Sequence, residues 1–231
     1  MNVLLESADA PSARRRATRE RLLDAAIEIF AEEGLQGAAV EAICSRAGFT
    51  RGAFYSNFES KEQLFLALLK REFERRAAYL EAQATALEPA LRERGPRLAP
   101  AEAADYIADF FAPECDATTW FALETEFLLL ALRDPSIAPG HHRFMDDFYL
   151  GIAGAVERVV AAAGRRFVLP VEHAMPVLSG VYERALRAEA LSGGDGGALD
   201  TLGDRLAEVL FALTAPLDAD EAAPIEPAPA G

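Results

Sequence analysis

Residues 40–61 have the sequence VEAICSRAGFTRGAFYSNFESK, and this stretch decides the fold. Apolar side chains recur at helical spacing over Val40–Ala47, which predicts a short helix with one narrow buried face. Gly48 ends this helix, because glycine adopts the left-handed conformation that closes a helix without a steric penalty. Thr50 is a good N-cap for a second short helix, which we expect to end near Phe58.

A helix, a glycine turn and a second short helix make up a helix-turn-helix, in which the second helix enters a DNA major groove. Phe54 and Phe58 would face the core at i, i+4. Ser60 and Gln63 form the pattern of a capping box, which predicts that a third helix starts there. A helical hairpin in an unrelated all-α domain fits the same pattern, so the flanking sequence has to decide between them.

The charge distribution favours a nucleic-acid partner despite a net charge of −14. Residues 1–61 carry eight Arg or Lys against nine Asp or Glu, so the rest of the chain carries −13. Five arginines fall between positions 14 and 21, with only Glu20 opposing them. Such a basic segment can bind phosphates while the acidic body repels DNA elsewhere. A solvated tail without a role is the alternative for Arg14–Arg16.

Helical periodicity continues through the rest of the chain and predicts an all-α fold of about nine helices. Thr18 is expected to cap the first helix and Gly34 to end it, and the long helix that starts at Lys61 should stop before Pro89. No run shows the period-2 alternation of a strand. The helix at 119–133 is apolar almost all round, which predicts a position inside the protein. Further helices are expected over residues 101–112, 141–163, 171–191 and 199–213.

Composition and motifs exclude several classes of protein. An apolar content of 51% with 26% charged residues is that of a globular chain. No apolar run is long enough to span a membrane, and the first ten residues lack the pattern of a signal peptide. Cys44 and Cys115 lie far apart and match no metal spacing. We therefore expect the protein in the reduced cytoplasm, the default location for a chain without a disulfide pattern. No nucleophile elbow, metal-ligand cluster or phosphate loop is present, which predicts no enzyme activity, cofactor or metal.

Aromatic residues concentrate between positions 106 and 149 and are candidates for lining a pocket. Core packing alone would also account for them. Glu124 is a carboxylate in an otherwise apolar helix, so it needs an internal arginine, a dimer mate or a cationic ligand as its partner. The ligand-binding candidates are Phe110, Trp120, Phe121, Glu124, Phe127, Phe148 and Tyr149.

Residues 18–66 resemble the DNA-binding domain of TetR/AcrR-type transcriptional regulators. The resemblance rests on RERLLDAAIEIFAEEG from Arg19 and on the pattern A-G-x-T-x-G-x-x-Y-x-x-F-x-x-K-E-x-L from Ala47 to Leu64. It implies a homodimer that binds a near-palindromic double-stranded DNA operator. It also implies a variable C-terminal domain that dimerises and holds a small hydrophobic effector, whose binding relieves repression.

The resemblance also assigns roles within the DNA-binding domain. It implies phosphate contacts for Thr50, Tyr55 and Lys61. Arg51 is the best base reader, since arginine pairs bidentately with guanine, and Gly52 permits a close backbone approach. The full set of DNA-binding candidates is Arg15, Arg16, Thr50, Arg51, Gly52, Tyr55, Ser56, Asn57 and Lys61.

The chain departs from the family pattern before the second helix of the domain. Ala38 and Ala39 stand where many members have a capping Thr or Ser, so one phosphate contact is lost. Glu41 would lie near the DNA backbone and either weaken binding or accept a proton from cytosine N4. We expect Arg14–Arg16 to compensate.

We therefore expect four segments: a disordered basic arm (1–16), a helix-turn-helix domain (17–63), a helical ligand-binding and dimerisation domain (64–214) and a disordered tail (215–231). Two other hypotheses remain open. One is a small helical enzyme that uses Glu124 and a histidine, and the other is a DNA-binding protein with a sealed core and no ligand. Two apolar stripes fit either a dimer interface or the core of the monomer, namely Val177, Val181 and Ala185 with Leu202, Leu206, Val209 and Leu213.

Overall fold

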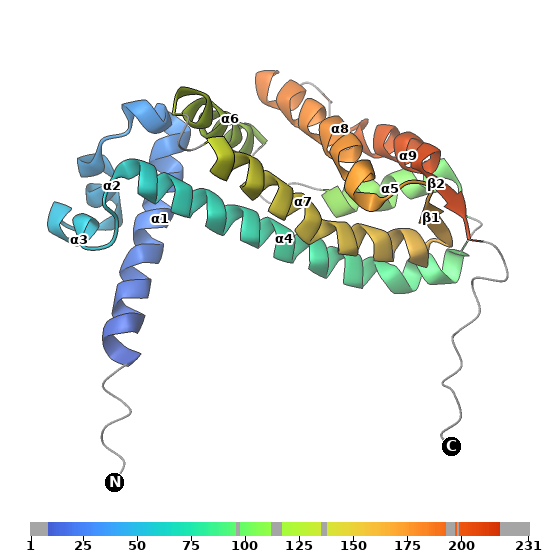
Figure 1. Cartoon of the computed structure of the whole chain (residues 1–231), viewed down its shortest axis with the longest axis horizontal. Coiled ribbons are helices and arrows are strands. Elements are labelled where there is room, and N and C mark those ends of the chain that lie inside the picture. Colours follow the sequence, from blue (N-terminus) through green and yellow to red (C-terminus); the bar gives the residue numbers. More distant parts are fainter. Residues whose placement is uncertain are drawn as a thin grey trace, which may run out of the picture. The chain divides into compact units, whose positions relative to one another are not determined.

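The computed structural model describes residues 9–95, 98–111, 117–134, 138–192, 197 and 199–217. Nine helices and one two-stranded sheet account for most of these residues, which confirms the predicted all-α class (Figure 1). The chain divides into two compact units, one within residues 1–75 and 119–141 and the other within 76–118 and 142–231. Within the described ranges, none of the helices combines the length and the apolar character that a bilayer crossing requires.

The first unit holds α1 (Asp9–Gly37), α2 (Val40–Ala47), α3 (Arg51–Tyr55), the first part of α4 (Lys61–Arg94) and α6 (Ala117–Arg133). Its core is aromatic and aliphatic. The rings of Phe30 and Phe65 meet edge to face at 5.2 Å, and Phe54 and Phe58 are buried as predicted. The fully buried side chains also include Leu22, Leu35, Ile43, Leu64, Leu68 and Leu69.

Helix α1 starts earlier than the sequence predicts. It begins at Asp9, so residues 9–16, which we expected in a disordered arm, are helical. Thr18 therefore lies inside the helix, and its hydroxyl donates to the Arg14 carbonyl at 3.1 Å instead of capping the N-terminus. Alanine and arginine favour helices strongly enough to carry α1 through this segment. Gly34 has φ 68° and ψ 169°, which breaks the regular helix at the predicted residue.

Helix α4 was expected to stop before Pro89, but it continues to Arg94. Proline removes one backbone hydrogen bond inside a helix and crowds the preceding turn. The turn after it is nevertheless retained, because Leu91 is only 1% exposed in a cluster with Leu98 and Ala163. Tertiary packing thus outweighs the local cost, and a single helix supplies residues to both compact units.

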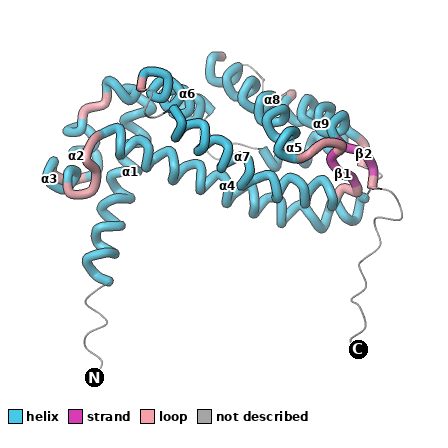
Figure 2. The backbone as a smooth tube through the Cα atoms, in the orientation of Figure 1, coloured by secondary structure: helices cyan, strands magenta, loops and turns pink. Residues whose placement is uncertain are grey.

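The second unit contains the end of α4, α5 (Pro100–Phe111), most of α7 (Ala138–Ala162), α8 (Val171–Leu191) and α9 (Leu202–Leu213). It also holds two strands that the sequence analysis missed, β1 (Arg165–Phe167) and β2 (Thr214–Pro216), paired antiparallel (Figure 2). Three residues are too few for a visible alternation, and the second strand extends into the segment expected to be a disordered tail. Residues 218–231 of that tail and residues 1–8 of the arm lie outside the described ranges.

Helix α6 is less buried than its apolar sequence predicts. Leu123, Phe127 and Ala131 are buried at successive helical turns, whereas Leu128 is 46% and Leu132 is 72% exposed. The prediction that this helix lies inside the protein is therefore wrong. An apolar composition alone does not distinguish a buried helix from one with an exposed apolar face.

Candidate nucleic-acid interface

The turn between α2 and α3 has the geometry that the sequence predicts. Gly48 takes a left-handed conformation (φ 71°, ψ 36°), and its N–H donates to the Ser45 carbonyl. The Thr50 hydroxyl oxygen then accepts a hydrogen bond from the Ala53 N–H at 3.3 Å, which confirms its role as the N-cap of α3. Two short helices are thus joined at a fixed angle, although α3 ends at Tyr55, before Phe58.

The start of α4 has the Ser60 half of the predicted capping box, whereas the Gln63 side chain bonds to Glu59 in place of Ser60. The Gln63 N–H donates to the Ser60 hydroxyl at 3.1 Å, while the Gln63 side chain accepts from the Glu59 N–H at 2.6 Å. By contrast, Ala39 at the N-cap of α2 has no side-chain hydrogen bond, as its sequence implies.

The outer face of α3 carries the residues expected to touch DNA. Arg51, Gly52 and Thr50 are exposed, and the Tyr55 side chain is 49% exposed. A Cβ added at Gly52 would meet only Thr50 Oγ1, at 3.7 Å. The surface beside Gly52 is therefore open to a close-approaching molecule.

Arg51, the predicted base reader, is held by Glu41 of α2 at 2.6 Å. The pKa of Arg51 is raised above its ordinary value, first by a hydrogen bond with Tyr55 and then by the nearby Glu41 carboxylate. Both members of the ion pair are more than half exposed, so water screens their attraction. In the free protein, Glu41 can position the Arg51 side chain. An anion or base that binds the guanidinium more strongly can then displace Glu41.

Arginines of α1 bind the end of α3. Arg15 Nη2 donates to the Ser56 carbonyl and Arg19 Nη1 to the Asn57 carbonyl, each at 3.2 Å. The Arg19 guanidinium also lies 4.2 Å from the centre of the Phe58 ring. Helix C-terminal carbonyls carry partial negative charge, which favours cations there. The described part of the expected disordered arm, residues 9–16, is therefore helical, and Arg15 attaches it to the end of α3.

Three further candidates have local partners. The Ser56 hydroxyl and the Asn57 amide both donate to the Ala53 carbonyl at 2.8 Å, so they close the end of α3. Lys61 Nζ donates to the carbonyls of Gln36 at 3.0 Å and Ala38 at 3.2 Å, which fixes the segment before α2. An ammonium has three N–H donors, so one is left for a phosphate. Arg16 is exposed on α1.

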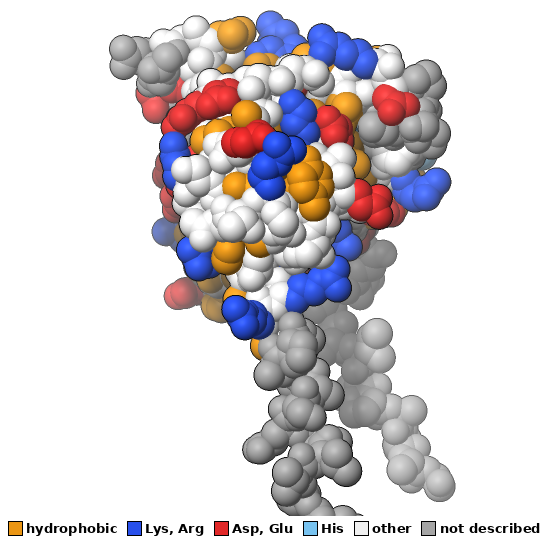
Figure 3. All heavy atoms as spheres, turned by 90° about the vertical axis from the view of Figure 1, so that its left-hand side faces the viewer, with side chains coloured by type: hydrophobic (Ala, Val, Ile, Leu, Met, Phe, Trp, Pro, Cys, Tyr) orange, Lys and Arg blue, Asp and Glu red, His pale blue; other side chains and the backbone are white. Residues whose placement is uncertain are grey.

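Figure 3 shows Lys and Arg side chains separated by acidic and uncharged groups over the face it presents. Ion pairs within the first unit account for part of this pattern, since Arg46 pairs with Glu28 and Arg51 with Glu41. On the face shown, the cations are therefore single side chains separated from one another by acidic and uncharged groups.

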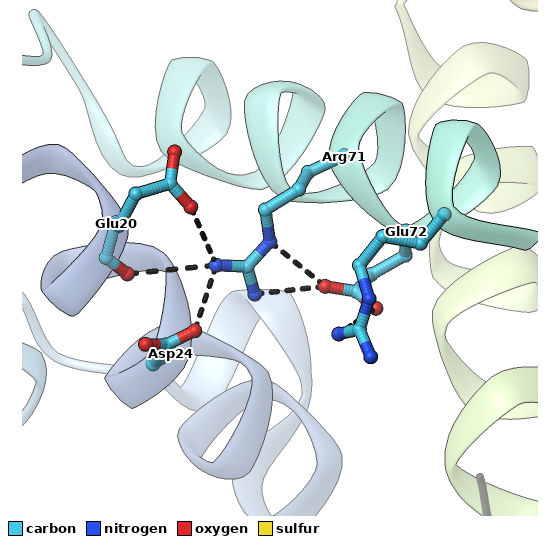
Figure 4. Close-up of polar contacts among 5 residues, drawn as sticks. Glu20, Asp24, Arg71 and Glu72 are labelled. Carbon is cyan, nitrogen blue, oxygen red and sulfur yellow. Dashed lines mark hydrogen bonds and ion pairs between the residues drawn. The ribbon is translucent and has the colours of Figure 1, made fainter. Parts of the chain in front are cut away.

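A cluster that sequence analysis missed connects α1 to α4. Arg71 Nη1 lies 2.7 Å from Asp24 and 3.2 Å from Glu20 of α1, and Arg71 Nη2 lies 2.7 Å from Glu72 (Figure 4). Burial alone would lower the pKa of Arg71, but the hydrogen bonds with Glu72, Asp24 and Glu20 outweigh it and raise the pKa. The cluster fixes how α1 lies against α4. No sequence motif could reveal it, because Glu20 and Arg71 are 51 positions apart.

Replacing Arg71 with methionine should lower the free energy of unfolding by about 2 kcal/mol, because three carboxylates lose a largely buried partner. Thermal unfolding followed by circular dichroism measures the change. Lys70→Met is the matched control, since Lys70 is exposed and lies 3.7 Å from Glu74. Equal melting temperatures for the two variants would show that the cluster contributes nothing.

The candidates for ligand binding are divided between the two units. Phe121, Glu124 and Phe127 lie on α6 in the first unit, and Glu124 already interacts with other residues of the chain. Phe148 and Tyr149 pack against the core of the second unit, where the Tyr149 hydroxyl is 2.5 Å from Glu183. The side chain of Trp120 lies outside the described part.

Of these candidates, Phe110 lines an apolar cavity of the second unit. Within the described ranges, His, Cys, Asp and Glu side chains form no cluster that could hold a metal ion.

Comparisons with known proteins agree with the geometry of the first unit. The profile of the tetR family of bacterial regulatory proteins matches residues 22–68. The HTH-type transcriptional regulator TtgW of Pseudomonas putida is 40% identical over 58 residues, which cover 25% of this chain and 43% of that protein. The HTH-type transcriptional repressor AcnR of Corynebacterium diphtheriae is 41% identical over 59 residues, or 26% and 31% of the two chains. The matches thus span less than half of these relatives.

Solved structures resemble the chain over a greater length. The crystal structure of a TetR-family regulator from Mesorhizobium loti has a TM-score of 0.68 at 17% identity, and the match covers 87% of this chain and 98% of that one. At this identity the likeness concerns the fold. The matched profile, the relatives and the geometry of α2 and α3 agree with one another: residues 22–68 match the tetR family of bacterial regulatory proteins, and the longer chain shares the fold of a solved TetR-family regulator.

Proposed function

We propose that the chain is a ligand-responsive transcriptional repressor that binds a near-palindromic DNA operator as a homodimer. The observation that carries this proposal is the exposed face of α3, where Thr50, Arg51 and Tyr55 stand on a helix fixed by Gly48 and by the arginines of α1. A capped short helix with an arginine at its start fits a major groove. The name of the relative AcnR supports repression over activation.

The proposed contacts divide into two kinds. Arg51 reads base edges, and Gly52 lets the backbone come close. Thr50, Tyr55 and the third donor of Lys61 bind phosphates, which set the register without reading sequence. The remaining donors of Arg15 and the exposed Arg16 add phosphate contacts along α1. Ser56 and Asn57 act mainly by closing α3, since their side chains already bind the Ala53 carbonyl.

A homodimer is proposed because an operator with two half-sites needs two recognition helices at a fixed spacing. Most residues of the two apolar stripes expected at the dimer interface pack inside the monomer, since Ala185, Leu202 and Leu206 are buried in the chain's own core. The face of α8 that stays exposed is better suited to a second copy. Its apolar and small exposed residues are Pro176, Val177, Gly180, Ala188 and Leu191, and the exposed Arg184 and Arg187 lie on the same helix.

The response to a ligand is proposed to pass through α4. This helix begins with Lys61, which holds the segment before α2, and contains Arg71, which holds α1. It ends near Leu91, which lines the cavity of the second unit. A ligand that shifts the end of α4 would thus act on a helix bonded to both α1 and the α2 segment. Such a protein acts on chromosomal DNA, so the cytoplasm is its proposed location, and the role is not enzymatic.

Selection from a random duplex library with the full-length chain tests the proposal. We expect enrichment of an inverted repeat, bound by two chains per duplex with a Kd that rises steeply with salt. Light scattering on the complex gives the stoichiometry. If no sequence is enriched, or if one chain binds one site, operator recognition by a homodimer is wrong.

Lys61→Met should weaken binding to selected and scrambled duplexes alike and reduce the slope of log K against log[salt] by about 1 per chain. A purely structural role would lower the melting temperature and leave that slope unchanged. Fluorescence anisotropy in a salt series measures both affinities. Lys70→Met, which removes an exposed lysine from the same helix, should leave the slope as it is in the unaltered chain.

A further inference from the structure

The second unit contains an apolar cavity of about 60 Å³. Its walls come from α4, α5, α7, α8 and α9, and they are almost entirely hydrocarbon. Ile107, Phe110, Val159, Leu206 and Phe211 are among the lining residues. A cavity of about 150 Å³ holds benzene, so this one must widen to take an organic ligand.

One cation lines this apolar space. Arg165 of β1 donates from Nε to the Thr214 hydroxyl at 2.8 Å, and from Nη2 to the carbonyls of Thr214 at 2.9 Å and Phe211 at 3.3 Å. Its guanidinium lies 4.1 Å from the centre of the Phe211 ring. These contacts fix the plane and the position of the guanidinium. They use Nε and Nη2 and leave the other terminal nitrogen, Nη1.

Arg165 has no anionic partner among the described residues, where no carboxylate lies within ion-pair distance of it. Four other arginines of the second unit have partners: Arg92, Arg94 and Arg158 each pair with a carboxylate, as Arg158 does with Glu88 at 3.2 Å, and Arg76 stacks on the rings of Tyr79 and Tyr182. Burial lowers the pKa of Arg165. Its three hydrogen bonds leave the two N–H groups on Nη1 for another acceptor.

We propose that this cavity is the effector site and that it binds a hydrophobic monocarboxylate, with the carboxylate on Arg165 and the hydrocarbon part among Ile107, Phe110 and Val159. The proposal rests on the ligand-responsive function proposed above. A planar guanidinium held by its neighbours is the donor that suits a carboxylate, and the hydrocarbon walls offer nothing to a second charge. The ligand class is thus set by one cation at the edge of an apolar space.

Calorimetry with the full-length chain tests the ligand class, with octanoate as the probe and 1-octanol and octylamine as matched controls of equal chain length. We expect octanoate to bind roughly 10- to 100-fold more tightly than 1-octanol, and octylamine to bind least. This comparison needs no variant. Equal affinity for octanoate and 1-octanol, or no binding of octanoate at millimolar concentration, would overturn the proposal.

Arg165→Met tests the assigned residue. It should reduce octanoate affinity to that of 1-octanol and leave 1-octanol binding unchanged, whereas Arg165→Lys should restore part of the difference. Arg166→Met is the matched control, because Arg166 is exposed on the same strand and does not line the cavity. Unchanged octanoate affinity in Arg165→Met would overturn the assignment. Ala163→Leu, which fills the cavity without altering Arg165, should abolish binding of both ligands.

DNA binding is measured separately, so that the two proposals can fail independently. Failure to bind any selected duplex, with octanoate still bound, rejects the repressor and leaves the carboxylate site. Binding of an operator without any binding of octanoate rejects the carboxylate site alone. If octanoate binds but leaves the affinity for the operator unchanged, the site is not the effector site.

Discussion

Gly203→Ala is expected to destabilise the protein by about 3 kcal/mol, although alanine favours a helix more than glycine does. Gly203 lies in α9 where this helix crosses α5. A Cβ added there would lie 2.4 Å from the Ala104 carbonyl oxygen and 3.1 Å from the Ala108 Cβ. The first neighbour is backbone and cannot rotate away. The two helices must therefore separate, and the buried Leu206 and Ala207 beside them lose contacts.

The sign of the change in the free energy of unfolding shows whether helix propensity or packing dominates at Gly203. Helix propensity predicts a gain of up to about 1 kcal/mol for alanine, and packing predicts a loss. Thermal unfolding should show a fall on the order of 10 °C in the melting temperature. Gly151→Ala is the control, since Gly151 is exposed in α7 with nothing within 4 Å of the added Cβ. It should raise the melting temperature, and an equal rise in Gly203→Ala would refute the close contact.

The sequence predicts those parts of the fold that depend on near neighbours. Gly48, Thr50 and the pair Ser60 and Gln63 each act within four positions of their partners, and the structure has all three features. Helix α8 begins and ends at the predicted residues for a similar reason, since Pro170 precedes it and a glycine-rich sequence follows. Residues next to each boundary determine where these helices begin and end, so tertiary contacts shift the boundaries little.

The features that sequence analysis missed depend on distant partners. Arg71 meets Glu20 from 51 positions away, and Arg165 meets Thr214 from 49. Leu91 keeps the end of α4 helical because it packs on α5 and α7, and this packing outweighs the helix-breaking effect of Pro89. The cavity likewise takes its lining from five helices, and only Phe110 was among its predicted residues. Aromatic content indicated which segments are apolar, but it could not indicate which of them meet.

Arg51→Ala is expected to lower the preference for the selected operator over a scrambled duplex by roughly 5- to 150-fold per half-site. Arg51 is the first residue of α3, more than half exposed, and its side chain is placed by Glu41 at 2.6 Å and Tyr55. A guanidinium held in this way can present two donors to guanine O6 and N7. Alanine removes both donors, while the phosphate contacts proposed for Thr50 and Lys61 would remain. Affinity for scrambled DNA should therefore fall far less.

Two variants separate the reading of bases from the effect of charge. Arg46→Ala removes an exposed arginine from α2, where it pairs with Glu28, and should change both affinities alike. Glu41→Gln removes the anion that competes with DNA for Arg51, so it should strengthen binding to both duplexes and reduce the preference, because Arg51 is less well placed. Fluorescence anisotropy on selected and scrambled duplexes at one salt concentration measures all three. If Arg51→Ala keeps the preference of the unaltered chain, another residue reads the operator, and Arg51 binds only the backbone.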